Sequence, residues 1–196
     1  MMKKKDELNL FTEQENKNLQ VLTELLEKMQ TDDSPLLKIR IGRMYLEGKV
    51  PGIDEDTAHK TAVTYFNIAL EAKCPDAYYA IASSCDMEQP EKYREPEKCA
   101  SLYKMALDSD VIPAYLEFGR CLEAGYGVER DLETAFLCYK YAAEKGYVYA
   151  YRFLAECYAF GKGCEVDHKK SGEWYKKLID ETGLPEAMTI FFTVCA

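Results

Sequence analysis

The stretch Leu122–Tyr147 reads LEAGYGVERDLETAFLCYKYAAEKGY and contains two glycines, a short charged run and a segment with helical periodicity. A similar stretch, YAFGKGCEVDHKKSGEWYKKLIDETGL, follows at 158–184. Gly125 and Gly127 permit the positive φ angles of a tight turn, and Asp131 stands where its side chain can cap a helix. The stretch therefore predicts a turn through which one helix folds back onto a second helix.

The repetition extends over most of the chain. Ala114 and Ala150 lie 36 residues apart in matching surroundings, AYLEFGRCLEAGYG and AYRFLAECYAFGKG. Ala77 precedes Ala114 by 37 residues, Ala187 follows Ala150 by 37, and Leu37 precedes Ala77 by 40. A fixed period of this length is the signature of a repeat architecture. We predict four complete repeats, at 35–74, 75–111, 112–147 and 148–184, and the first helix of a fifth at 185–196.

Each repeat is predicted to be a pair of helices with one buried face on each. In the third repeat, Ala114, Phe118 and Leu122 recur at helical spacing on the first helix, and Ala135 and Tyr139 begin the buried face of the second. Prolines recur where a missing N–H costs nothing, at the first turn of the first helix. These prolines are Pro35, Pro75, Pro113 and Pro185.

The two ends of the chain differ from the repeats. We predict that residues 1–11 are disordered and that 12–33 form an N-terminal capping helix, because Thr12 and Glu15 fit a capping box. The apolar stripe of this helix consists of Leu19, Leu22, Leu25, Leu26 and Met29. At the other end, the apolar helix at 185–196 is expected to pack back on the fourth repeat, which predicts a monomer. The alternative is a homodimer formed through this helix.

These residues carry a resemblance to a known family. Gly119, Gly125, Gly127 and Asp131 of the third repeat and Trp174 of the fourth match the consensus A-x-x-x-L-G-x-x-Y-x-x-G-x-G-V-x-x-D-x-x-K-A-x-x-W-Y-x-K-A-A-x-x-G. The chain thus resembles the Sel-one-like repeat (SLR) family, which is related to the tetratricopeptide repeat. The resemblance implies an all-α fold, a right-handed α/α superhelical solenoid of helix pairs over residues 34–196.

The second repeat departs from this pattern. It reads MEQPEKYREPEK where the glycine turn should be, with Pro90 and Pro96. We expect a turn of different shape there. Either this repeat has drifted, or its loop is a specific contact surface.

Charge and composition limit the partners. The chain has a net charge of −9 and a pI near 4.9, which disfavours nucleic acid and anionic membranes. The basic opening is followed by no apolar run, so we expect no secretory signal and a cytoplasmic protein, with export by a specialised secretion system as the alternative. Eight scattered cysteines without a Cys-x-x-Cys pair are expected to be reduced core residues.

Little in the sequence points to catalysis or to a cofactor. Ser101 and Lys104 have Ser-x-x-Lys spacing, but Lys104 falls on the exposed side of its helix and no Ser-Asp-Asn or Lys-Thr-Gly motif accompanies it. Cys157, Cys164 and His168 are close in sequence, yet no fourth zinc ligand is evident. We therefore expect no catalytic residue, no metal and no cofactor.

The stripe of each first helix opposite the core is the candidate partner surface. The resemblance implies that the first helices line the concave face of the solenoid. The stripe mixes apolar residues with three of the six arginines, a composition typical of protein interfaces. Arginine binds carboxylates in a bidentate manner. The residues predicted to line this groove are Ile39, Arg43, Leu46, Tyr79, Leu116, Arg120, Glu123, Arg152 and Glu156.

We therefore predict a non-enzymatic adaptor or scaffold that binds an acidic helix, loop or terminus of another protein. A different reading of the stripe is that the arginines only neutralise Glu123, Glu156 and their neighbours on adjacent helices. Two alternative functions stay open. One is an immunity or inhibitor protein, or an exported effector, that binds a toxin or a host protein, and the other, less favoured, is a hydrolase.

Overall fold

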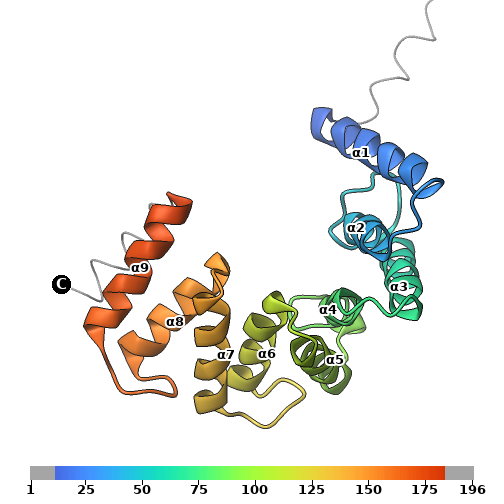
Figure 1. Ribbon diagram of the computed structural model, residues 1–196. Coiled ribbons are helices and arrows are strands. Elements are labelled where there is room, and N and C mark those ends of the chain that lie inside the picture. The colour runs from blue at the N-terminus through green and yellow to red at the C-terminus, as the bar shows by residue number, and fades with distance from the viewer. Residues whose placement is uncertain (1–11, 184–196) are drawn as a thin grey trace, which may run out of the picture. The chain divides into compact units, whose positions relative to one another are not determined.

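The computed structural model describes residues 12–183, and within this range the chain forms helices and no strands (Figure 1). The predictions for residues 1–11 and for the helix at 185–196 lie outside the described residues. The helices are α1 Glu13–Met29, α2 Pro35–Leu46, α3 Glu55–Glu71, α4 Asp76–Ser83, the 3₁₀ turn Glu91–Tyr93, α5 Pro96–Asp108, α6 Ile112–Ala124, α7 Leu132–Glu144, α8 Val148–Phe160 and α9 His168–Thr182. The predicted all-α fold of repeated helix pairs is confirmed.

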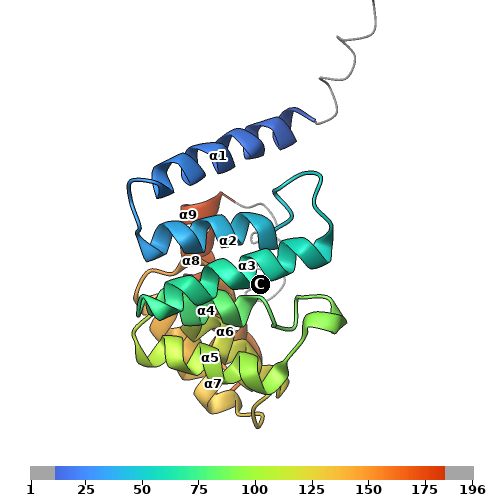
Figure 2. The same ribbon diagram turned by 90° about the vertical axis from the view of Figure 1, so that its right-hand side faces the viewer.

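The chain divides into two compact units, and the division falls between Ser84 and Cys85. In the first unit, α1 packs on α2, α2 packs on α3, and α4 contacts both α2 and α3; Figure 2 shows α1, α2 and α3 side by side. In the second unit, each helix from α5 to α9 packs on the next one along the chain. The division lies inside the second predicted repeat, so that α4 and α5 belong to different units. One continuous solenoid over 34–196 stays a prediction.

The glycine turns recur with the predicted period of 36 residues. Gly125 and Gly161 end α6 and α8 in the left-handed conformation. Gly127 lies so close to the start of α5 in space that an added Cβ would be 1.9 Å from the carbonyl oxygen of Pro96. The second turn repeats this contact, with a Cβ on Gly163 lying 1.9 Å from the carbonyl oxygen of Leu132. The second glycine of each turn therefore lets the loop rest on the second helix of the preceding repeat.

Helix starts follow the predicted caps. The side chain of Asp131 accepts a hydrogen bond from the N–H of Thr134 at 3.0 Å. At the start of α1, Thr12 and Glu15 form the predicted capping box, in which each side chain accepts a hydrogen bond from the other residue's N–H. These bonds satisfy N–H groups that have no partner inside the helix.

The predicted capping helix packs on the first repeat. Leu22 and Leu25 of α1 are buried against an apolar cluster from α2 that includes Leu37, Ile41 and Met44. Leu19, at the start of the predicted stripe, stays 38% exposed. The cluster covers an apolar face of α2 that would otherwise face water, as the end of a repeat array requires.

The core of the second unit is built from small residues and buried tyrosines. Tyr103, Tyr139 and Tyr175 recur at intervals of 36 residues and are each almost completely buried. Gly119 makes room for one of these rings, since an added Cβ would lie 2.6 Å from Tyr139. In the first unit, Gly42 makes room for Phe66 in the same way.

The cysteines of residues 12–183 are free, as predicted. Most of them fill the core of the second unit and are nearly inaccessible to solvent. These core thiols are Cys85, Cys99, Cys121, Cys138 and Cys157. Burial raises the pKa of the Cys138 thiol to about 11 and that of Cys157 to about 12, so both thiols are protonated at neutral pH. Cys195 lies outside the described residues.

The second repeat has the predicted irregular turn and also a shortened first helix. The first helices α2, α6 and α8 contain 12, 13 and 13 residues, but α4 contains eight and ends at Ser83. Without a glycine in the left-handed conformation, the chain leaves α4 through the 3₁₀ turn Glu91–Tyr93 instead. A hydrogen bond from the N–H of Glu95 to the carbonyl of Cys85, at 3.1 Å, closes this loop before Pro96 starts α5.

Candidate partner-binding surface

In the first unit, the structure brings two of the predicted residues together. The guanidinium of Arg43 on α2 lies over the ring of Tyr79 on α4, 5.3 Å from its centroid. Leu46 ends α2 and is half-buried. Ile39 is an exception, because it is 94% buried and offers almost no surface to a partner. The physical reason is that α2 packs against α1, α3 and α4, so more than one face of the helix is covered.

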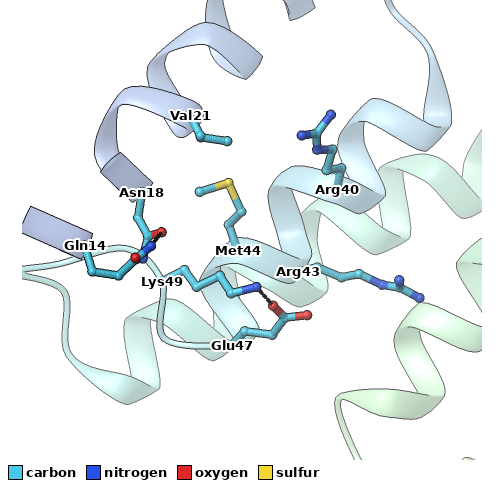
Figure 3. Close-up of a pocket in the computed structure, with 8 residues that line it drawn as sticks. All are labelled: Gln14, Asn18, Val21, Arg40, Arg43, Met44, Glu47 and Lys49. Carbon is cyan, nitrogen blue, oxygen red and sulfur yellow. Dashed lines mark hydrogen bonds and ion pairs between the residues drawn. The ribbon is translucent and has the colours of Figure 1, made fainter. Parts of the chain in front are cut away.

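A pocket with a volume of about 370 Å³ lies between α1 and α2, with Arg43 on its rim (Figure 3). Lys49 and Glu47, which follow α2, form an ion pair across one side of it. Arg40 also lines the pocket. The sequence analysis missed it because the predicted stripe advanced from Ile39 to Arg43 and then to Leu46, in steps of four and three residues. The lining residues are Gln14, Asn18, Val21, Arg40, Arg43, Met44, Glu47 and Lys49.

In the second unit, the guanidinium of Arg120 is held by two carboxylates. Its Nη1 contacts Glu117 Oε2 at 2.8 Å, and its Nη2 contacts Glu88 Oε1 at 2.6 Å. Burial disfavours the charge of Arg120, but the two carboxylates outweigh burial and raise the pKa of its guanidinium. Glu117 is the most buried member of this cluster, and burial raises its pKa although Arg120 opposes the shift. The alternative interpretation, that arginine neutralises neighbouring acids, therefore describes Arg120, with Glu117 and Glu88 as the acids.

The two predicted glutamates, Glu123 and Glu156, form contacts with other residues of the protein. Glu123 accepts hydrogen bonds from the hydroxyl of Tyr139 at 2.8 Å and from Lys162 Nζ at 2.7 Å. Lys162 also lies 3.8 Å from Glu156. Burial would raise the pKa of Glu123, but the bonds from Lys162 and Tyr139 outweigh burial and lower it. Glu123 thus ties α6, α7 and the turn after α8 together, a role that the sequence analysis did not foresee.

A second pocket, with a volume of about 330 Å³, lies beside these groups and contains Arg152, the more accessible of the two arginines predicted for the second unit. The Arg152 side chain is 52% exposed, lies over the ring of Phe153 at 4.7 Å and is 3.8 Å from Glu156. Tyr149, which the sequence analysis missed, is 72% exposed. Leu116 is 96% buried, so it forms part of the pocket lining and presents little surface. The lining residues are Glu88, Leu116, Glu117, Arg120, Tyr147, Tyr149, Arg152 and Phe153.

The residues weighed for catalysis do not line either of these pockets. Ser101 and Lys104 are both exposed on α5, and His168 is exposed at the start of α9. His59 Nε2 lies 2.7 Å from the carbonyl oxygen of Ser84 within the first unit. Among residues 12–183, no three His, Cys, Asp or Glu side chains gather in a way that suits a metal ion. No helix in the same range is both long and apolar enough to span a bilayer.

Comparison with known proteins identifies the repeats. A family model described as Sel1 repeat matches residues 38–74, 112–147 and 148–181. The matched ranges leave out 75–111, the repeat with the short α4 and the proline-containing turn.

Solved structures share the fold. A Sel1 repeat protein from Oxalobacter formigenes is 25% identical with a TM-score of 0.67, over 87% of this chain and 67% of that one. A protective antigen of uropathogenic Escherichia coli strains with an SLR fold is 17% identical, with a TM-score of 0.72, and the match covers 90% of this chain but 36% of that one. Cysteine rich protein B of Helicobacter pylori is 21% identical with a TM-score of 0.50, over 71% and 98% of the two chains.

Proposed function

Because this chain belongs to the Sel1 repeat family, whose members generally mediate protein–protein interactions, we propose that it is a non-enzymatic adaptor that binds an acidic segment of a partner protein. The family is generally a non-catalytic scaffold. Repeat folds carry many unrelated roles, so the choice of partner has to be argued from the surface itself.

The observation that carries the proposal is the pocket around Arg152. Exposed aromatic side chains and arginine are the residues most enriched at protein interfaces and their hot spots. Tyr149 is largely exposed beside Tyr147, with ring centroids 5.4 Å apart, and Arg152 is half-exposed at the same pocket. Within residues 12–183, its one carboxylate contact, with Glu156, is long at 3.8 Å and leaves donors for a carboxylate of the partner.

Arg120 supports this surface without offering its own charge to a partner. Its two short ion pairs occupy the guanidinium, and replacing it with glutamate would place a third acid beside Glu117 and Glu88. Such a variant would lose stability as well as any partner. Arg152 is therefore the residue to change.

The test compares Arg152→Glu with Lys176→Glu, which reverses one exposed charge on α9 of the same unit. Each protein is immobilised and exposed to native lysate. We expect the wild type and Lys176→Glu to retain the same partner, and we expect Arg152→Glu to lose it. The partner is then purified, and its Kd for each variant is measured by calorimetry. Equal Kd values for Arg152→Glu and the wild type would refute the proposed surface.

The other expectations about function stay predictions. An inhibitor or an exported effector would use the same pocket and differ in the partner bound there. A cytoplasmic location, the absence of nucleic-acid and membrane partners, the lack of catalytic activity and a monomeric state are likewise predictions.

A further inference from the structure

The pocket between α1 and α2 carries uncompensated positive charge. Three cations line it, Arg40, Arg43 and Lys49, together with one acid, Glu47, which is already paired with Lys49. Within residues 12–183, no carboxylate lies at ion-pair distance from Arg40 or Arg43, and both arginines are exposed. In a chain with 34 acidic and 25 basic residues, two such arginines at one pocket mark a local exception to the overall charge.

The two arginines also repel each other. Arg40 and Arg43 stand three residues apart on α2, and like charges at this spacing destabilise a helix slightly. Figure 3 shows their side chains leaving α2 in different directions. The guanidinium of Arg43 lies over the ring of Tyr79 on α4. A ligand that neutralises both arginines must reach two guanidinium groups that point apart. It therefore needs more than one carboxylate.

The remaining walls of the pocket are apolar and amide-bearing. Met44 of α2 is buried, and Val21 of α1 is 37% exposed, so together they form an apolar patch inside a ring of polar groups. On α1, Gln14 Nε2 donates to Asn18 Oδ1 at 3.0 Å, which places an amide pair at the same pocket. A ligand that suits these walls carries an apolar side chain between its acidic groups.

We infer that this pocket is a second binding subsite, which takes an acidic, amphipathic segment of a partner protein. An apolar side chain of the segment packs on Val21 and Met44, and its carboxylates pair with Arg40 and Arg43. The inference rests on the proposed function, since it assumes a polypeptide ligand, but it concerns a different pocket and different arginines. Charge complementarity favours a short acidic segment over nucleic acid, because the chain as a whole repels a long polyanion.

The test uses the methyl resonance of Met44 as a local probe. The full chain is labelled at its methionine methyl groups, and the resonance is assigned with the Met44→Leu variant. The ligand is an acetylated and amidated peptide with two leucines flanked by glutamates, and the same peptide with glutamines is its control. The acidic peptide is expected to shift the Met44 resonance, and the glutamine peptide is expected to leave it unchanged.

Variants then separate this subsite from the Arg152 pocket. Arg40→Glu is expected to weaken the peptide affinity at Met44 by at least about tenfold, equivalent to about 1.4 kcal/mol. Arg40→Gln should give a smaller loss and serves if the reversed charge perturbs the fold. Lys60→Glu, the same charge change on α3 of this unit, and Arg152→Glu should leave the Met44 titration unchanged.

Three results would overturn the inference. They are no shift of Met44 with the acidic peptide, an unchanged affinity in Arg40→Glu, and an oligothymidylate that shifts Met44 as strongly as the peptide. None of them bears on the Arg152 pocket, whose own test is the Kd of the captured partner. Conversely, loss of the proposed function at Arg152 with an intact Met44 titration would leave this subsite standing.

Discussion

The second and third repeats each contain a hydrogen bond from a buried tyrosine to a carboxylate, and in the third repeat that carboxylate also binds a lysine. In the second repeat, the hydroxyl of Tyr103 donates to Asp86 Oδ2 at 2.9 Å, and in the third, the hydroxyl of Tyr139 donates to Glu123 Oε2 at 2.8 Å. Lys162 also binds Glu123, whereas the second hydrogen bond to the carboxylate of Asp86 comes from the N–H of Glu88. Burial raises the pKa of Asp86, and the cation helps lower that of Glu123.

The difference shows which part of the contact the fold requires. A buried hydroxyl needs an acceptor. In both repeats a carboxylate supplies it, from the last turn of α6 in Glu123 and from the loop just after α4 in Asp86. The cation beside that carboxylate is not required, because in the described part of the chain the second repeat forms the contact with no ion pair to Asp86. Acidic residues at this position therefore serve packing first, and they should not be counted among the groups offered to a partner.

The largest effect is expected where the turn of the third repeat rests on the second. Gly127→Ala would force a positive φ of 67° on alanine and push its Cβ into the carbonyl of Pro96. We expect the free energy of unfolding to fall by about 3 kcal/mol or more, from backbone strain and steric clash together. Urea denaturation followed by circular dichroism measures it.

Gly146→Ala is the matched control for this prediction. Gly146 has a positive φ of 85°, but an added Cβ meets nothing within 4 Å. Only the strain of the left-handed conformation remains, about 1 kcal/mol. Equal losses in the two variants would show that the close contact between turn and helix contributes nothing to stability.

Removing the tyrosine hydroxyls tests the contact itself. Tyr103→Phe is expected to lower the free energy of unfolding by about 2 kcal/mol, because it leaves a buried carboxylate with one donor fewer. Tyr139→Phe should cost about 1 kcal/mol, since Glu123 keeps its bond from Lys162. The measurement is the difference between the two urea midpoints relative to wild type. A larger loss in Tyr139→Phe would reverse the ranking and refute the role given to Lys162.

The fold could be predicted from sequence because its signals are local and repeated. The left-handed Gly125, the cap at Asp131 and the capping box of Thr12 and Glu15 each depend on residues within a few positions, and each is found in the structure. The period itself followed from alanines that are completely buried, such as Ala114 and Ala150. Completely buried positions tolerate little change in side-chain size, so the repeat can be recognised in a single sequence.

The candidate surface was less predictable because its partners are distant in sequence. Glu123 looked like a surface residue, but its contacts are Tyr139 and Lys162, which lie 16 and 39 residues away. Ile39 and Leu116 were placed on the surface from one helical face, yet helices in a repeat array pack on neighbours on both sides. A stripe on one helix cannot show how many of its faces are covered.

The smallest expected effect is a change in the pH dependence of stability, which compares Glu123 directly with Asp86. Glu123 has a pKa lowered from 4.5, so its stabilising contribution is present above about pH 4.5 and is lost as the pH falls through its folded-state pKa. Asp86 has a pKa raised from 3.8, so its charged form costs stability progressively as the pH rises from about 3.8 through its folded-state pKa. The two acids therefore act in opposite directions over the same range of acid pH.

Glu123→Gln and Asp86→Asn isolate these contributions when unfolding is measured in urea from about pH 3 to 6.5. As the pH rises, the advantage of the wild type over Glu123→Gln should grow, and its advantage over Asp86→Asn should shrink. The sign of each slope is the test, because a fixed loss of packing shifts a whole curve without tilting it. Parallel slopes for the two variants would mean that the cation at Glu123 makes no electrostatic difference between the repeats, and the comparison would then reduce to two equivalent hydrogen bonds.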